Sequence, residues 1–230
     1  TGATSGSTAG LNKSSDKGSS GIGISAAVSV NLVDDDARAT VGGAGTVNTG
    51  LLAGSGDGAV SLSAINQSVI WSLAGAATIN VSSSGASGLA GAFTFNRVRG
   101  TTEAELIGTG ALVADGTIDV EAARGGGNVS GSGDDQRLEG GIQSLAASAS
   151  GSAQAEGLQI AGSAAYAEID NETAATVSRR AITASSLNVE AQDDSDIWTI
   201  GGAATLGGKG GFGAGVTVND VVLAMCAGAL

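Results

Sequence analysis

The chain has 230 residues, of which 42% are hydrophobic, 3% are aromatic, 40 are Gly and none is Pro. Its mean hydropathy of +0.22 argues against a disordered linker, and the absence of Pro suits β-strands, because Pro removes a donor from the strand ladder. The net charge of −12 argues against nucleic acid and anionic membranes as partners.

The first 21 residues, TGATSGSTAGLNKSSDKGSSG, are rich in Ser, Gly and Thr, and we expect residues 1–21 to be a flexible lead-in. They contain neither a signal peptide nor an initiator Met, so we expect a processed chain or a piece of a longer one. We expect residues 22–230 to be a single continuous domain, because neighbouring repeats share their stability.

An alternating segment follows the lead-in and recurs three times. Its copies are ISAAVSVN (24–31), LAGAFTFN (89–96), AGSAAYA (161–167) and FGAGVTVN (212–219). When they are aligned on Asn31, Asn96, Ala167 and Asn219, the same columns recur after 65, 71 and 52 residues. Apolar and small polar residues alternate with a period of two, which predicts a strand in every copy.

Two further segments follow in a constant order. The second comprises ARATV (37–41), TEAEL (102–106) and TAATV (173–177), each preceded by turn-forming residues. The third comprises AVSLSA (59–64), TIDVEA (117–122) and SLNVEA (186–191). Every copy of the third segment has apolar residues on one face and polar residues on the other, which predicts a strand buried on one side.

The fourth segment contains the only two tryptophans. SVIWSLAGAAT (68–78) and SDIWTIGGAAT (195–205) share seven of eleven residues. Alternation from Leu73 places Trp71 inward, so we expect both indoles to be buried packing elements, with a paired surface site as the alternative. The middle repeat has no Trp and carries an insertion before the strand-like residues 141–155.

Together these patterns predict an all-β fold, a β-solenoid (parallel β-helix-like) built from irregular repeats of roughly 50–70 residues. An array of β-sandwiches is the alternative, but so few aromatic residues hardly fill several sandwich cores. If one turn of the solenoid takes about 20–25 residues, the chain makes roughly ten turns. We expect the run VVLAMCAGAL (221–230), with Cys226, to be a buried strand, because it is too short to span a membrane.

The phrases AAVSVNLVDDDARATVGGAGTV, IDVEA and LNVEAQ resemble the repeat regions of large secreted bacterial surface proteins, the filamentous haemagglutinin and leukotoxin-like adhesin group. The resemblance covers most of residues 22–219. It implies an exported stalk or filament at the outer bacterial cell surface or outside the cell, acting in cell adhesion and virulence. The implied partners are other copies in a fibre or a host or cell-surface ligand. The resemblance brings no catalytic or ligand residues to this chain.

Acidic turns offer the main alternative chemistry. Asp34–Asp36, Asp134–Asp135 and the group Asp193, Asp194 and Asp196 could supply oxygen ligands to calcium, but the tandem GGxGxD repeat is absent. We therefore expect these residues to form solvated turns, with no metal or cofactor site.

An enzyme acting on polysaccharides is a second alternative, since paired carboxylates can cleave glycosidic bonds. The chain has no His and only 10 basic residues, so we expect no enzymatic activity and no catalytic residue. A Thr ladder that binds ice, with Thr94 and its counterparts facing outward, lacks a repeated Thr-x-Thr array. We expect residues 49–58 and 123–140 to be variable loops.

Overall fold

The structure is a computed structural model that describes residues 8–12, 22–49, 58–80, 87–125, 141–152, 157–207 and 209–229. These residues form β-strands and short turns and contain no helix, so the prediction of an all-β chain is confirmed. No helix in this part of the chain is long and apolar enough to cross a membrane.

The strands alternate between long and short elements along the chain. In order they are β1 (Thr8–Asn12), β2 (Ile22–Asp34), β3 (Ala37–Val41), β4 (Val47–Thr49), β5 (Val60–Asn66), β6 (Val69–Asn80), β7 (Ser87–Ala114), β8 (Thr117–Gly125), β9 (Gly141–Ser152), β10 (Leu158–Thr183), β11 (Ser186–Asp194), β12 (Asp196–Leu206) and β13 (Gly210–Ala229).

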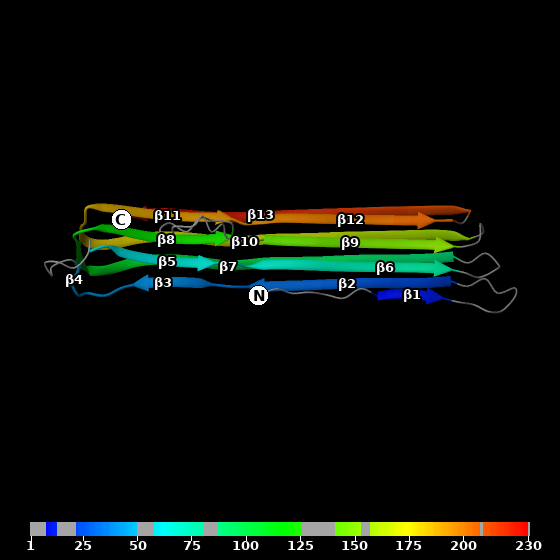
Figure 1. The fold of residues 1–230 in the computed structure, drawn as a ribbon, viewed down its shortest axis with the longest axis horizontal. Coiled ribbons are helices and arrows are strands. Elements are labelled where there is room, and N and C mark those ends of the chain that lie inside the picture. The colour runs from blue at the N-terminus through cyan, green and yellow to red at the C-terminus, as the bar shows by residue number, and fades with distance from the viewer. Residues whose placement is uncertain are drawn as a thin grey trace.

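These strands form three parallel sheets (Figure 1). The β7 sheet has the order β2-β7-β10-β13, with β3 and β4 also paired to β7. The β8 sheet has the order β5-β8-β11, and the β9 sheet has the order β1-β6-β9-β12. After β1, the chain visits the β7, β8 and β9 sheets in turn and then begins the cycle again.

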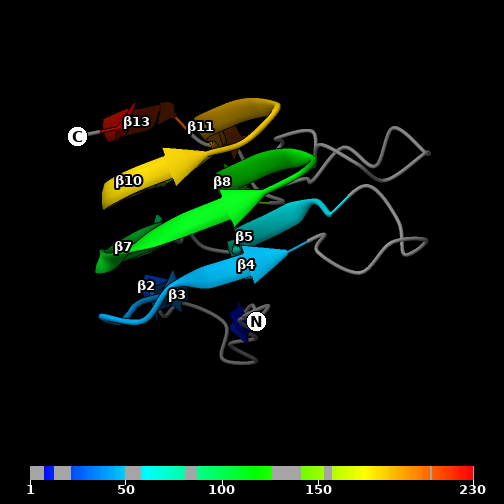
Figure 2. The ribbon, with the colours of Figure 1, turned by 90° about the vertical axis from the view of Figure 1, so that its left-hand side faces the viewer.

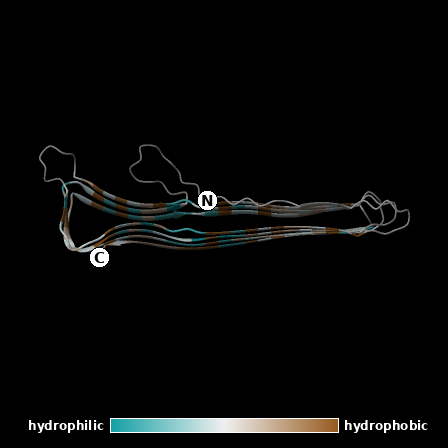
Figure 3. Cartoon of the chain, turned by 90° about the horizontal axis from the view of Figure 1, so that it is seen from below, coloured by the Kyte–Doolittle hydropathy of each residue, from teal (hydrophilic) through white to brown (hydrophobic). Residues whose placement is uncertain are grey.

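The three sheets lie in two flat layers (Figure 3). The β7 sheet makes one layer, and the β8 and β9 sheets lie end to end in the other. The end view in Figure 2 shows β4, β7, β10 and β13 stacked beside β5, β8 and β11. The long strands of the β7 sheet are therefore covered by the β8 sheet over one part of their length and by the β9 sheet over the other.

Successive repeats pair with one another in the register that the sequence columns predict. Asn31 lies opposite Asn96, Asn96 opposite Ala167, and Ala167 opposite Asn219. One repeat therefore adds one strand to each sheet. The expected turn of about 20–25 residues was wrong, because β7 has 28 residues and β10 has 26, and both continue through the residues expected to turn.

A conventional apolar core lies between the β8 sheet and the carboxyl-terminal halves of β7 and β10. Its buried side chains include Leu106, Leu112, Ile118, Val120 and Val177. The predicted alternation of the third segment is confirmed in β8, where apolar residues at every second position face this core.

The interior between the β9 sheet and the amino-terminal half of the β7 sheet contains small residues. Alanines from five strands form one part of its apolar lining: Ala27, Ala74, Ala76, Ala92, Ala146 and Ala165. A second buried cluster contains larger residues, Ile70 and Ile142 of the β9 sheet with Val98 and Ile169 of the β7 sheet. Hydroxyl groups meet across the two layers, since the oxygens of Ser29 and Ser72 lie 2.9 Å apart and those of Thr94 and Ser144 lie 2.8 Å apart. Such short side chains let two backbones approach closely, which leaves the larger apolar residues of these strands facing outward.

The last strand differs from its prediction. Residues 221–229 form a strand as expected, but β13 pairs only with β10, and most of its side chains are exposed. Cys226 is exposed rather than buried. The apolar run resembled a buried strand because its counterparts in the β7 sheet are covered by neighbours on both sides.

Two predicted segments fall largely outside the described residues. In residues 1–21, only Thr8–Asn12 is described, and it forms β1 in parallel with β6. In the predicted variable loops, residues 50–57 and 126–140 lie outside the described residues.

Candidate binding site

Both tryptophans lie on the outer face of the β9 sheet, so the prediction that they are buried was wrong. Trp71 is 59% exposed and Trp198 is 56% exposed. The inward residues of β6 are Ile70, Ser72 and Ala74, and the alternation runs without a break from the buried Ala64 of β5. Trp71 follows Ala64 by seven residues, and an odd spacing along a continuous extended chain changes the face. This odd spacing is the feature of the sequence that indicates an outward-facing Trp71.

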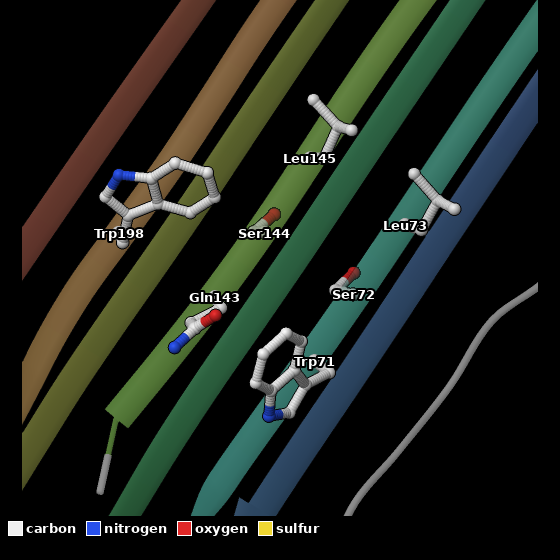
Figure 4. Close-up of a pocket in the computed structure, with 7 residues that line it drawn as sticks. All are labelled: Trp71, Ser72, Leu73, Gln143, Ser144, Leu145 and Trp198. Atoms are coloured by element: carbon white, nitrogen blue, oxygen red, sulfur yellow. The ribbon is translucent and has the colours of Figure 1, made fainter. Parts of the chain in front are cut away.

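The two indoles lie over the sheet on either side of Gln143 and flank a slot (Figure 4). Gln143 of β9 lies opposite Trp71 of β6 on one side and opposite Trp198 of β12 on the other. The slot has a volume of about 380 Å³, and Leu73 and Leu145 also line it. Because β9 lies between β6 and β12, the missing Trp of the middle repeat opens this space.

The floor of the slot is supplied by the main chain of the β9 sheet. Ser72 and Ser144 line the slot, but their side chains turn inward and are buried. Their hydroxyl groups lie next to those of Ser29 and Thr94 in the opposite layer. These pairs join β6 and β9 to the β7 sheet, so the strands beneath the slot are held in place by the opposite layer.

The chemistry of the slot is apolar and neutral. None of its seven lining residues among the described part of the chain carries a charge. Gln143 lies between the two indoles, and its side-chain amide can both donate and accept a hydrogen bond. The slot can therefore hold a flat, uncharged group with an apolar face and polar edges.

A second hollow crosses the outer face of the β7 sheet. Small residues of successive strands share one column, from Ala26 through Gly91 and Gly162 to Ala214, and larger residues flank it. The volume of this furrow is about 480 Å³. A Cβ atom added at Gly162 would meet no atom within 4 Å, so the floor of the furrow is open to solvent.

The acidic turns of the first and third repeats meet around Arg124 rather than forming independent sites. Arg124 is 1% exposed, and its Nη1 donates to the carbonyl oxygen of Asp35 at 3.4 Å. Burial lowers the pKa of Arg124, and the charges of Asp193, Asp35 and Asp36 partly offset that shift. Asp193 is only 8% exposed, so its prediction as a solvated turn was wrong.

Hydrogen bonds within and between repeats occupy several of these carboxylates. Asp35 accepts from the Ser68 hydroxyl at 2.8 Å, and Asp36 accepts from the Thr101 backbone N–H at 2.8 Å. Among the described residues, no group of three or more His, Cys, Asp or Glu side chains is placed to hold a metal ion. Asp134 and Asp135 lie outside the described residues.

The predicted outward Thr residues do not form an outer ladder. Thr94 is fully buried against Ser144, and Thr199 donates to the Asn219 side chain at 2.7 Å. No protein-family model, curated protein or solved structure matches this chain. The features of the molecule that bear on its function are therefore the slot, the outer faces and the pairing of the repeats.

Proposed function

We propose that this chain is a segment of a β-solenoid and serves as a non-enzymatic structural or adhesive stalk of an exported bacterial surface or fibre-forming protein. The observation that carries the proposal is the in-register parallel pairing of successive repeats. Each repeat adds one strand to each of the three sheets, so additional repeats lengthen such a stack without changing its cross-section.

Side-chain ladders between repeats support the proposal. Asn31 donates to Asn96 at 2.7 Å, and the rings of Phe95 and Tyr166 stack with centroids 5.1 Å apart. Farther along the same strands, Arg97 pairs with Glu168 at 3.1 Å and Arg99 pairs with Asp170 at 3.1 Å. Cross-strand pairs of this kind stabilise one register over its alternatives.

The outer face at the amino-terminal end of the β7 sheet supports self-association. Its exposed apolar residues come from all four strands: Ile22, Ile24, Val28, Val30, Leu32, Leu89, Phe93, Leu158, Ile160, Phe212, Val216 and Val218. A monomeric soluble protein rarely exposes so large an apolar patch. A second copy packed on this face would bury apolar surface while the ion pairs farther along β7 and β10 remained in water.

The proposal fixes the direction in which the stack grows. A strand of about 28 residues spans about 90 Å, whereas four strands side by side span only about 15 Å at about 4.8 Å per step. This chain is therefore a plate whose long axis follows the strands. Further repeats would lengthen the stack perpendicular to the strands and produce a ribbon about 90 Å across.

Small-angle X-ray scattering of the monomeric chain tests this shape. A plate about 90 Å long has a radius of gyration of roughly 27 Å, whereas a compact globule of this length has about 17 Å. A measured radius equal to that of the globule would contradict the proposal. Antibodies against the chain should also label intact bacteria that encode it, and labelling that required permeabilised cells would contradict the proposed location.

A further inference from the structure

We propose that the slot between Trp71 and Trp198 binds one pyranose ring of a neutral carbohydrate. The inference rests on the adhesive part of the proposed function and gives it a ligand class. It begins from the positions of the two indoles, which are the only tryptophans of the chain and are both more than half exposed.

The spacing of the two indoles suits a single ring. Trp71 and Trp198 lie two strands apart, which separates their backbones by about 9.6 Å. Both indoles lie over the sheet on either side of Gln143 (Figure 4), and each presents a ring face on which a sugar ring can stack at about 3.5–4.0 Å. A pyranose ring seated over Gln143 can therefore contact the flanking indoles.

The floor of the slot favours a sugar over an aromatic side chain. Gln143 lies between the indoles and offers an amide that donates and accepts hydrogen bonds. An aromatic ring from a peptide would cover this amide without bonding to it, and burial of an unpaired polar group is costly. A pyranose presents apolar C–H groups to the indoles and hydroxyl groups to the amide, so it satisfies both surfaces.

The charge of the surroundings selects a neutral sugar. The seven lining residues described here are uncharged, the chain carries a net charge of −12, and the exposed Asp196 lies on the same face two residues before Trp198. These charges repel uronic acids and sulfated sugars.

The equivalent column of the opposite sheet shows what a packing ladder looks like in this protein. There, Phe95 and Tyr166 are on adjacent strands, and their rings stack at 5.1 Å with 5° between the ring planes. In the β9 sheet the two indoles are separated by the strand that carries Gln143. A column that served only for packing would bring the aromatic rings of neighbouring strands into contact, as in Phe95 and Tyr166. The column of the β9 sheet instead leaves a space between its two indoles that a ligand ring can occupy.

Tryptophan fluorescence tests the proposal directly, because both emitting residues flank the slot. The whole chain is titrated with cellohexaose, maltohexaose, mannohexaose and chitohexaose, and with oligogalacturonate as the acidic comparison. We expect a saturable change in emission with at least one neutral oligosaccharide and none with oligogalacturonate. No change with any neutral member would overturn the proposal, as would a response to a Trp- or Phe-containing peptide alone.

Variants locate the binding. With Trp71→Ala or Trp198→Ala we expect calorimetric affinity to fall by about threefold to tenfold for the loss of one stacking indole. Gln143→Ala should also weaken binding, whereas Ile79→Ala, at an exposed residue of the same face and strand as Trp71, should not. Equal loss in Ile79→Ala would place the sugar elsewhere and overturn the proposal. A chain that binds no sugar but scatters as the extended plate would lose only this inference, and the stalk would stand.

Discussion

Arg124 is a single buried charge shared by three repeats. It lies on β8, its guanidinium contacts the Asp35 carbonyl of the first repeat, and Asp193 of the third repeat is the nearby carboxylate that most favours its charged form. A buried carboxylate left without its cation is strongly destabilising. We expect Arg124→Ala to lower the free energy of unfolding by about 3–5 kcal/mol in urea denaturation. Arg38→Met is the control, since Arg38 is 62% exposed and its ion pairs contribute about 1 kcal/mol or less. Equal losses in the two variants would contradict this account.

Tyr166 is the only tyrosine of the chain, so the ionisation of its phenol can be measured without interference from another tyrosine. Burial raises the pKa of Tyr166 above its usual value of 10.0, and the adjacent Glu168 carboxylate raises it further. The unfolded chain therefore releases this proton first as the pH rises, and the stability gained by keeping the phenol neutral is lost as the pH approaches the folded pKa. Absorbance at 295 nm should show a midpoint above 10 in the folded chain and near 10 in guanidinium. We expect Glu168→Gln to lower the folded midpoint, and a folded midpoint at or below the unfolded one would refute the assignment.

Within a strand, close approach between repeats restricts particular positions to glycine. A Cβ atom at Gly100 of β7 would overlap the Asp35 carbonyl oxygen and lie 2.7 Å from Arg124 Nη1. Gly162 of β10, in the outer furrow, has open space around its own Cβ position. We expect Gly100→Ala to cost about 2–3 kcal/mol of unfolding free energy, because backbone atoms must move. Gly162→Ala should leave the urea midpoint unchanged or raise it slightly. If the two variants have the same midpoint, the contact at Gly100 does not constrain the fold.

For the individual strands, the sequence predicted their positions and their register better than it predicted which side chains point into the interior. Columns such as the one that contains Asn31 and Asn96 predicted the register, because identical residues stack readily when repeats pair in parallel. The facing direction failed at Trp71, because large apolar residues were assumed to point inward. Next to Trp71, the inward residues Ser72 and Ala74 join the layers through short side chains, which bring the two backbones close together. The unbroken alternation from Ala64 was the reliable guide.

At the scale of the whole molecule, the length of a repeat did not reveal the length of one turn. The spacing between equivalent columns is equally consistent with several short turns or with one long one. Long extended strands decide between them here, because the residues of β7 and β10 expected to turn remain paired with each other, and those of β10 are also paired with β13. The slot followed from that geometry: Trp71 and Trp198 are far apart in sequence, and pairing of one strand per repeat places them two strands apart. Composition alone carries no such information.

The apolar outer face of the β7 sheet leads to a prediction about assembly. Leu89 on β7 and Ile160 on β10 lie opposite one another on this face, and both strands are interior to the sheet. Leu89→Lys combined with Ile160→Lys places two charges in the patch without touching an open strand edge. We expect wild-type chain to associate as its concentration rises in sedimentation velocity, and we expect the double variant to weaken that association at least tenfold, since burial would then desolvate two charges.

A matched variant separates the position of the new charges from their number. Thr109→Lys combined with Ser178→Lys adds the same two charges to exposed residues of the same two strands, at their carboxyl-terminal ends. This control should associate like the wild type, because its charges lie beyond the apolar patch. If both double variants dissociate equally, the lower net negative charge or the strand edges govern assembly. If neither dissociates, the face of the β7 sheet is not the contact, and the open edges at β2 and β13 become the surfaces through which copies join.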